Sequence, residues 1–163
     1  MTCFPEVLSN ARFYLELKLE GSNDSVDGIF MDCSGFQQSQ DVIEISEVTP
    51  QLWGKNGDVK GRVVRTKLPG NVTYTNLFLR RGLTSSMTLW NWLQQIQQGH
   101  WAEQRRDGSL VIYNQAAEEQ FRFEFQGAWP VRYKISDLDV KSGDFNVEEM
   151  EVVVEYLNRV EPK

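Results

Sequence analysis

Residues that carry most enzyme and metal chemistry are scarce in this sequence. It holds one histidine, His100, and two cysteines, Cys3 and Cys33, which stand far apart and form no CxxC pair. Zinc clusters and histidine-based triads need several such residues, so neither is indicated, and a disulfide framework is not indicated either. We predict two reduced, partly buried thiols and a structural or solvent role for His100.

Long apolar runs are also missing. None approaches the roughly 20 residues that a helix needs to cross a bilayer. The N-terminus lacks the basic-then-apolar layout of a signal peptide. We therefore expect a protein that stays in the cytoplasm after synthesis and does not insert into a membrane.

Motifs of catalytic and nucleotide-binding loops are absent: GxSxG, GxxxxGK[ST], GxGxxG and HExxH do not occur. Two groups of neighbouring carboxylates stand out, Glu118 with Glu119, and Glu148 with Glu149 and Glu151. The first group lies in an expected hairpin turn and the second begins an expected strand. We therefore predict a solvated surface for both groups rather than a catalytic acid and base. The sequence predicts no enzyme activity, no metal and no cofactor.

An excess of positive charge is lacking too. The net charge of -6 argues against general nucleic-acid binding. The charge is unevenly distributed, because Lys55–Arg81 holds seven basic residues and one acidic residue, a net +6, which leaves -12 for the rest of the chain. A chain divided in this way can be complementary to itself.

Alternating apolar residues predict strands in the first half of the chain. In residues 12–20, Phe13, Leu15, Leu17 and Leu19 alternate with charged and polar residues, the pattern of a strand with one buried face. A turn-rich segment then leads to a shorter strand at residues 29–33. Because the connection is short, we expect these two strands to be antiparallel neighbours.

Two further alternating segments, residues 40–48 and 61–68, predict the strands of one long hairpin. Their connection contains an Asn-Gly-Asp turn signal and two large apolar residues, Leu52 and Trp53, which have no evident place in a core. Exposed apolar residues on a projecting loop mark a contact with another molecule. Folding of the tip back onto the domain is the open alternative.

A Pro-Gly pair, Pro69 and Gly70, follows the second hairpin strand. We predict that this pair ends the strand and turns the chain back into its own sheet. Leu77 and Leu79 then support another short strand.

One segment has helical period, with apolar residues at i, i+3, i+4 and i+7: Leu89, Trp92, Leu93 and Ile96. We expect Thr84 or Ser85 to cap the start of this helix. Gly99 is expected to provide the left-handed residue that ends it.

The last third of the chain returns to the strand pattern. Residues 109–114 and 120–127 flank a short polar connection, which predicts a hairpin. A strand at residues 131–135 and a last long strand near residues 147–157 follow. Seven or eight strands and one helix predict a mainly β fold, an antiparallel β-sandwich or barrel with one flanking α-helix and a long hairpin. We expect a single domain over residues 1–163.

Four tryptophans leave a binding function open: Trp90, Trp92, Trp101 and Trp129. Aromatic side chains at helical spacing or beside a proline are more often core, but they also stack on ligands. The alternative function is therefore a monomeric β-barrel binding module for a small ligand or peptide. A basic strand over Lys60–Lys67 that binds an anionic ligand or nucleic acid is disfavoured, because no aromatic residues interleave it.

Several short motifs together resemble the tail tube family: SGF at 34–36, KLPG at 67–70, NLFLRRG at 76–82, the helix with Trp92, and AWP at 128–130. That family includes the inner tube proteins of contractile phage tails and of phage-like contractile injection systems. The resemblance runs from about Phe13 to Leu157. Family members often carry a Gly-Gly pair in the hairpin region, where this chain has LWGKNG.

The resemblance implies a structural role. A β-barrel-like domain would form homo-hexameric rings, and the long hairpins would close an inner barrel around a channel. Stacked rings would form a tube with sheath and baseplate proteins as partners and with cargo in the lumen. Assembly in the bacterial cytoplasm, followed by a place in a phage tail or injection particle, is then expected, without sequence-specific nucleic-acid binding.

Two sets of candidate site residues follow from the charge division and the resemblance. Candidates for subunit or inter-ring contacts are the apolar tip, the basic segment and the acids of the last strand: Leu52, Trp53, Lys60, Arg62, Arg65, Arg80, Arg81, Glu148, Glu149 and Glu151. Candidates for the channel wall are Asp41, Glu44, Arg62 and Arg65. The inward face of the hairpin stays open, because Val42 and Glu44 share one face while Ile43 and Ile45 share the other.

Overall fold

A computed structural model describes residues 13–17, 30–53, 58–114, 116–137 and 145–161. The chain divides into two compact units. Unit 2 is Gln38–Thr73, and unit 1 is made of Met1–Gln37 and Tyr74–Lys163. The single domain expected over residues 1–163 stays a prediction.

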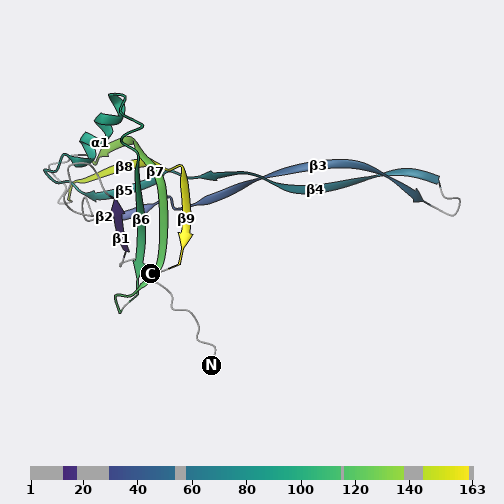
Figure 1. Ribbon diagram of the computed structural model, residues 1–163, viewed down its shortest axis with the longest axis horizontal. Coiled ribbons are helices and arrows are strands. Elements are labelled where there is room, and N and C mark those ends of the chain that lie inside the picture. Colours follow the sequence, from purple (N-terminus) through teal and green to yellow (C-terminus); the bar gives the residue numbers. More distant parts are fainter. Residues whose placement is uncertain (1–12, 18–29, 54–57, 115, 138–144, 162–163) are drawn as a thin grey trace. The chain divides into compact units, whose positions relative to one another are not determined.

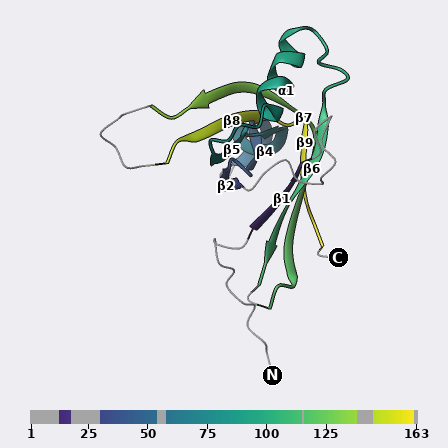
Figure 2. The ribbon, with the colours of Figure 1, turned by 90° about the vertical axis from the view of Figure 1, so that its left-hand side faces the viewer.

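Unit 1 contains, in its described part, seven strands and one helix. In chain order they are β1 (Phe13–Leu17), β2 (Phe30–Ser34), β5 (Leu77–Gly82), α1 (Thr88–Gln97), β6 (Arg106–Tyr113), β7 (Glu119–Ile135), β8 (Val147–Val153) and β9 (Tyr156–Val160). The strands form one sheet in the order β1-β6-β7-β8-β5-β2, with β9 beside β7. Figure 2 shows that β8 follows one half of β7, while β6 and β9 follow the other half. The predicted fold class, mainly antiparallel β with a flanking helix, is confirmed.

For β1, the sequence pattern predicts the buried face correctly but does not predict the neighbouring strand. Its apolar face is as predicted, because Leu15 and Leu17 are buried and Phe13 packs against the core. The expected pairing of the first two strands is wrong: β1 pairs with β6, with Leu15 opposite Leu110, and β2 pairs with β5. Alternation selects the buried face of a strand, but it does not select the strand that lies alongside.

The long strand β7 replaces two shorter strands that the sequence predicts. It continues through Pro130, and a register shift between Pro130 and Arg132 marks the change from one half to the other. Conversely, the last predicted strand is two strands, because the chain turns at Val154 and Glu155 between β8 and β9. The backbone N–H of Glu155 donates to the carbonyl of Gln126 (3.1 Å), and β9 then runs along the first half of β7.

The core of unit 1 is one cluster of buried apolar side chains to which every strand of the unit and the helix contribute. Its members are Leu15, Leu17, Phe30, Leu77, Leu79, Leu89, Trp92, Leu110, Phe125, Ala128, Met150, Val152, Val154 and Leu157. Full burial of a large apolar side chain stabilises a fold by roughly 1.5 to 3 kcal/mol. The cluster therefore holds together strands that lie far apart in the sequence.

The helix α1 buries three residues of the predicted apolar stripe, Leu89, Trp92 and Leu93, and the fourth, Ile96, is half-buried. The predicted cap is wrong, because the residue before the helix is Met87 and no side chain caps the helix start. The helix begins too late for Thr84 or Ser85 to cap it, and the hydroxyl of Thr84 accepts the backbone N–H of Ser86 within the loop instead (3.2 Å). Gly99 has a φ of +97°, so the predicted left-handed end is confirmed. No helix in the described ranges is long and apolar enough to span a bilayer.

Unit 2 is the predicted long hairpin. It consists of β3 (Gln38–Trp53) and β4 (Asp58–Tyr74, whose last residue belongs to unit 1), which form a two-stranded sheet (Figure 1). Both strands are longer than the alternating segments that predict them. Most of the predicted Asn-Gly-Asp turn, within residues 54–57, lies outside the described residues.

The prediction that Pro69 and Gly70 end the second hairpin strand is wrong, because β4 continues through both residues to Tyr74. In a two-stranded sheet each strand keeps one edge without ladder hydrogen bonds, so such a strand tolerates proline. Gly70 marks a close approach of the two strands, since a Cβ added to it would stand 3.1 Å from the Cβ of Asp41. The pair therefore belongs to the ribbon, and β5 begins only at Leu77.

Candidate assembly surfaces

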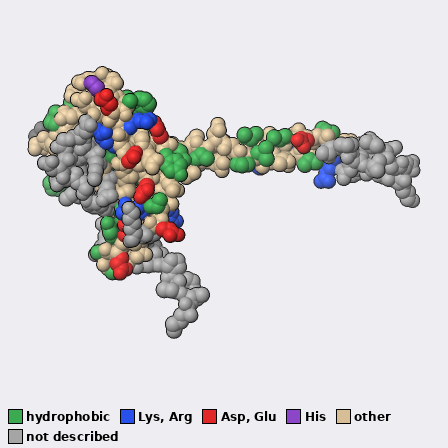
Figure 3. All heavy atoms as spheres, in the orientation of Figure 1, with side chains coloured by type: hydrophobic (Ala, Val, Ile, Leu, Met, Phe, Trp, Pro, Cys, Tyr) green, Lys and Arg blue, Asp and Glu red, His purple; other side chains and the backbone are tan. Residues whose placement is uncertain are grey.

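Among the hairpin side chains that the structure describes, eight large aliphatic ones are left exposed by the chain itself. Between 37% and 71% of each is accessible, and Figure 3 shows hydrophobic side chains along unit 2. We call this set the aliphatic hairpin surface: Val42, Ile43, Ile45, Val48, Val63, Val64, Leu68 and Val72. An isolated two-stranded hairpin is marginal in water. Exposed apolar side chains in this number on a projecting hairpin mark a contact with another molecule.

Polar contacts within the hairpin join its two strands without covering the aliphatic side chains. The hydroxyl groups of Ser39 and Thr73 lie 2.7 Å apart, and the Nζ of Lys67 lies 3.3 Å from a carboxylate oxygen of Glu44. Both partners of that ion pair are exposed, so it contributes only about 0 to 1 kcal/mol. These contacts set strand pairing, and the strength of any assembly has to come from apolar burial.

The predicted channel-wall residues Asp41, Glu44, Arg62 and Arg65 are all exposed on the hairpin. Their place in a channel stays a prediction. The contact candidates Leu52, Trp53 and Lys60 belong to β3 or β4 by their backbone, but their side chains lie outside the described residues.

A second surface is a row of paired charges on β2, β5, β8 and β7. Arg80 on β5 lies 3.6 Å from Asp32 of β2 on one side and 3.6 Å from Glu149 of β8 on the other. Further along the same strands, Arg132 on β7 lies 3.0 Å from Glu151 of β8. We call these five residues the charged sheet face. Each cation has an acidic neighbour within the chain, so the surface is charged but has no strong patch of one sign.

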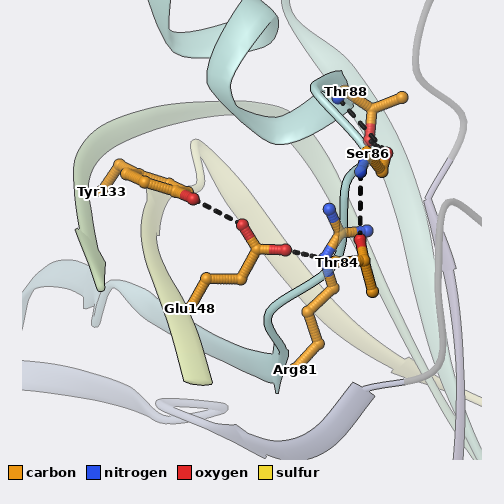
Figure 4. A network of polar contacts seen from close by, with 6 residues as sticks. All are labelled: Arg81, Thr84, Ser86, Thr88, Tyr133 and Glu148. Atoms are coloured by element: carbon orange, nitrogen blue, oxygen red, sulfur yellow. Dashed lines mark hydrogen bonds and ion pairs between the residues drawn. The ribbon is translucent and has the colours of Figure 1, made fainter. Parts of the chain in front are cut away.

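The other face of the same strands holds a buried ion pair, drawn in Figure 4. The Nε of Arg81 donates to the carboxylate of Glu148 (2.5 Å), and the hydroxyl of Tyr133 donates to the second oxygen of that carboxylate (2.6 Å). Desolvation by burial, and then the hydrogen bond to Glu148, raise the pKa of Tyr133 to about 12. The solvated surface predicted for Glu148 is wrong, because only 2% of this residue is exposed.

Several of the acidic and basic residues that the sequence predicts as contacts between subunits pair with one another within one chain. The antiparallel register places Arg80 opposite Glu149 and Arg81 opposite Glu148. Local sequence gives no signal for this arrangement, because the pairing of β5 with β8 joins segments 67 residues apart at Arg81 and Glu148. A further contact of Arg80, Arg81 or the three acids with a second subunit stays a prediction.

The tryptophans of unit 1 are engaged by groups of the same chain. Trp92 is buried, and its Nε1–H donates to the carbonyl of Gln104 (2.8 Å). The ring of Trp90 packs edge-on against Tyr133, with ring centroids 5.4 Å apart. Trp101 packs against Trp129 in the same manner at 6.5 Å. Only Trp92 belongs to the core cluster, whereas Trp90 and Trp101 are 40% and 43% exposed, so the core interpretation is confirmed for Trp92 and is wrong for these two.

The described residues that could bind a metal or act as acids, bases or nucleophiles are scattered, buried or paired with other groups of the chain. Within the described part of the chain, no cluster of three or more histidine, cysteine or acidic residues has the arrangement of a metal site. Glu118 and Glu119 have partners within the chain, Glu119 through its ion pair with Arg122 (2.7 Å). Cys33 is partly buried, as predicted, and burial followed by the nearby Asp32 carboxylate raises its pKa to about 12. Cys3 lies outside the described residues.

Comparison with protein families gives one match that spans most of the chain. Residues 9–158 match the family described as T4-like virus tail tube protein gp19. No curated protein matches the sequence.

Three solved structures with a similar fold come from contractile injection particles. A chain of the extracellular contractile injection system PVC sheath-tube complex in its extended state is 21% identical, with a TM-score of 0.72, and the match covers 95% of this chain and 92% of that chain. The tube-terminating cap of the anti-feeding prophage gives 18% identity and a TM-score of 0.74 over 99% and 95%. A chain of the anti-feeding prophage baseplate gives 18% and 0.66 over 98% of each chain.

Proposed function

We infer that this chain, which belongs to the T4-like virus tail tube protein gp19 family and is therefore a tail tube subunit, assembles into hexameric rings that stack around a channel. The observation that carries this proposal is the aliphatic hairpin surface. Its eight side chains are exposed in a single chain, and neighbouring copies of the hairpin are the partners that would cover them.

The geometry of the hairpin favours pairing between copies. In a two-stranded sheet both strands are edges, and each edge offers unpaired N–H and C=O groups to a further strand. Side-by-side hairpins would satisfy these groups and bury aliphatic side chains at the same time. Contacts of one surface with a different surface on the next copy close into rings when the rotation allows it.

The charged sheet face supports a role in lining the channel, together with Asp41, Glu44, Arg62 and Arg65 of the hairpin. A conduit through which cargo slides needs a wall without large apolar patches and without strong fixed binding of either sign. Arg80 lies between Asp32 and Glu149, which leaves little unbalanced charge at that point. Sheath and baseplate proteins are the further partners, and the particle is a phage tail or a contractile injection system assembled in the bacterial cytoplasm. Structural assembly without catalysis is the function proposed.

Electron microscopy of the purified protein tests the proposal. We expect rings with an open centre, and tubes at higher concentration. A variant with Val42→Ser and Val63→Ser should stay folded but shift the sedimentation profile towards monomers, because each apolar side chain buried between copies contributes up to roughly 1.5 to 3 kcal/mol. The matched control is Val131→Ser, which removes an exposed valine from unit 1. Strictly monomeric wild-type protein at high concentration would favour the alternative, a binding module for a small ligand or peptide.

A further inference from the structure

Two short segments of unit 1, residues 35–37 and 74–76, connect this unit with the two strands of the hairpin. We call these segments the hairpin root. The N–H of Thr75 donates to the carbonyl of Gln37 (3.2 Å), and the hydroxyl of Thr75 donates to the carbonyl of Gly35. The two segments are therefore tied to each other where the chain enters and leaves the hairpin.

Two aromatic contacts hold the hairpin root against β7 and β9. The ring of Phe36 stacks on Phe123 of β7, with centroids 5.7 Å apart, and the ring of Tyr74 packs edge-on against Tyr156 of β9 at 5.9 Å. Stacked and edge-to-face arrangements at this spacing stabilise a contact beyond the burial of the rings. Each segment of the root thus has its own aromatic anchor on the sheet.

The anchor on β9 is the more easily opened of the two. Tyr156 is 46% exposed, whereas Phe36, Phe123 and Tyr74 are partly buried and pack against the core cluster. β9 has five residues and contributes Leu157 to that cluster. A short strand with few buried side chains opens at a lower free energy than the central strands of a sheet. Tyr156 can therefore release Tyr74 without unfolding of the core.

We propose that Tyr156 and Phe123 form a clasp on the hairpin root and that this clasp has to be closed before copies of the subunit assemble. This inference rests on the proposed ring assembly and adds the step within one subunit that prepares it. A root that is already fixed in the free subunit loses less conformational entropy on assembly, so a closed clasp favours assembly and an open one slows it.

The order of the elements along the chain makes the clasp a checkpoint on assembly. The hairpin strands β3 and β4 are synthesised before β7, and β9 follows every other described element. The aliphatic hairpin surface is therefore complete in a growing chain before the residues that fix its root exist. Exposed apolar surface and open strand edges promote wrong association of unfinished chains. A root that stays loose until β9 docks keeps such chains out of the rings.

Hydrogen exchange at single amides tests the clasp in subunits kept monomeric by dilution. In Tyr156→Ala we expect the amide of Thr75 to exchange about tenfold faster, because loss of one aromatic contact raises the population of the open root by that order. Tyr156→Phe keeps the ring and should exchange as the wild type does. The amide of Asn91, which donates to the carbonyl of Met87 (2.8 Å), reports on the rest of unit 1 and should not change. Unchanged exchange at Thr75, or an equal acceleration at Asn91, would overturn the clasp.

Light scattering during ring and tube formation tests the role of the clasp in assembly. We expect Tyr156→Ala to assemble about tenfold more slowly than the wild type, because its root has to be ordered during assembly. Tyr156→Phe and Asn158→Ala, which changes an exposed residue of the same strand, should assemble at the wild-type rate. A normal rate for Tyr156→Ala with a faster-exchanging root would overturn the role in assembly. Failure of the wild-type protein to form any ring contradicts the proposed function instead, and the exchange measurement still decides on the clasp.

Discussion

Arg81 and Glu148 form a buried ion pair across β5 and β8, with the guanidinium Nε and a carboxylate oxygen 2.5 Å apart. Both side chains are almost fully buried, and Tyr133 donates a further hydrogen bond to Glu148. A buried pair adds little net stability compared with apolar residues of the same size, but removing one partner leaves a charge buried without compensation. Removing one partner is therefore expected to cost more stability than the intact pair contributes.

Arg81→Met should lower the free energy of unfolding by about 3 to 5 kcal/mol, because the Glu148 carboxylate loses its buried counter-charge. Adding Glu148→Met should restore most of the loss. Urea unfolding followed by circular dichroism measures both. The control is Arg80→Met on the same strand, whose exposed ion pairs are worth at most about 1 kcal/mol. Equal losses of unfolding free energy for Arg80→Met and Arg81→Met would show that burial of the Arg81–Glu148 pair does not raise the cost of breaking it.

Alkaline stability should depend on Tyr133. Its pKa is raised from an ordinary value of 10.0 to about 12, so the unfolded state loses this proton before the folded state does. The stability that the protonated hydroxyl provides is complete below pH 10 and is lost as the pH rises towards 12. Urea unfolding at several pH values between 9 and 11.5 should show a shallower decline for Tyr133→Phe than for wild type. Parallel declines would exclude Tyr133 as the source.

The Cys33 thiol should react slowly in the folded protein. Its pKa of about 12, raised by burial and by Asp32, leaves almost no thiolate at pH 8. In a Cys3→Ser background, we expect reaction with a disulfide reagent such as DTNB to be at least tenfold slower than in urea. A rate in the folded protein equal to that in urea would mean that the thiol is neither shielded nor shifted in pKa.

Gly35 is required where the chain passes from β2 towards the hairpin. Its φ is +92°, and a Cβ there would overlap the carbonyl oxygen of Asn76. Gly35→Ala should therefore cost more than about 1 kcal/mol of stability. Gly82→Ala is the control, because no atom lies within 4 Å of its added Cβ and the substitution should change stability by no more than about 0.5 kcal/mol. Thermal unfolding of the two variants compares them, and equal midpoints would contradict this account.

Local patterns predicted the faces of β1 and α1 because each periodicity reports a single element. Leu15 and Leu17 alternate with polar residues, and Leu89, Trp92 and Leu93 follow helical spacing. Burial confirms both stripes. A local pattern carries no information on which distant strand completes the pairing.

The wrong predictions for the second hairpin strand and for Glu148 have the same physical cause. A Pro-Gly pair ends a strand inside a wide sheet, but β4 is one of two strands and continues through Pro69. A glutamate that begins a strand is usually solvated, but β5 places Arg81 opposite Glu148. In both cases the deciding information lies in a partner strand that the local sequence does not reveal. Contacts between subunits are harder still to predict from local sequence, because they depend on the surface of another copy.

The hairpin tip should control assembly without contributing to the fold of the subunit. Leu52 and Trp53 end β3, far in sequence from the core cluster, whose members all lie in unit 1. Burial of each against another copy would contribute roughly 1.5 to 3 kcal/mol. Exposed ion pairs of the basic segment, at about 0 to 1 kcal/mol each, would mainly select partner and register. We expect the Leu52→Ser, Trp53→Ser variant to keep the circular dichroism spectrum of the wild type while tube formation, counted by electron microscopy, falls at least tenfold. Val131→Ser serves again as the control for loss of an exposed apolar side chain. Normal tubes from the double variant would show that the tip is a surface loop with no role in assembly. An unfolded variant would show that these side chains belong to the core of their own chain.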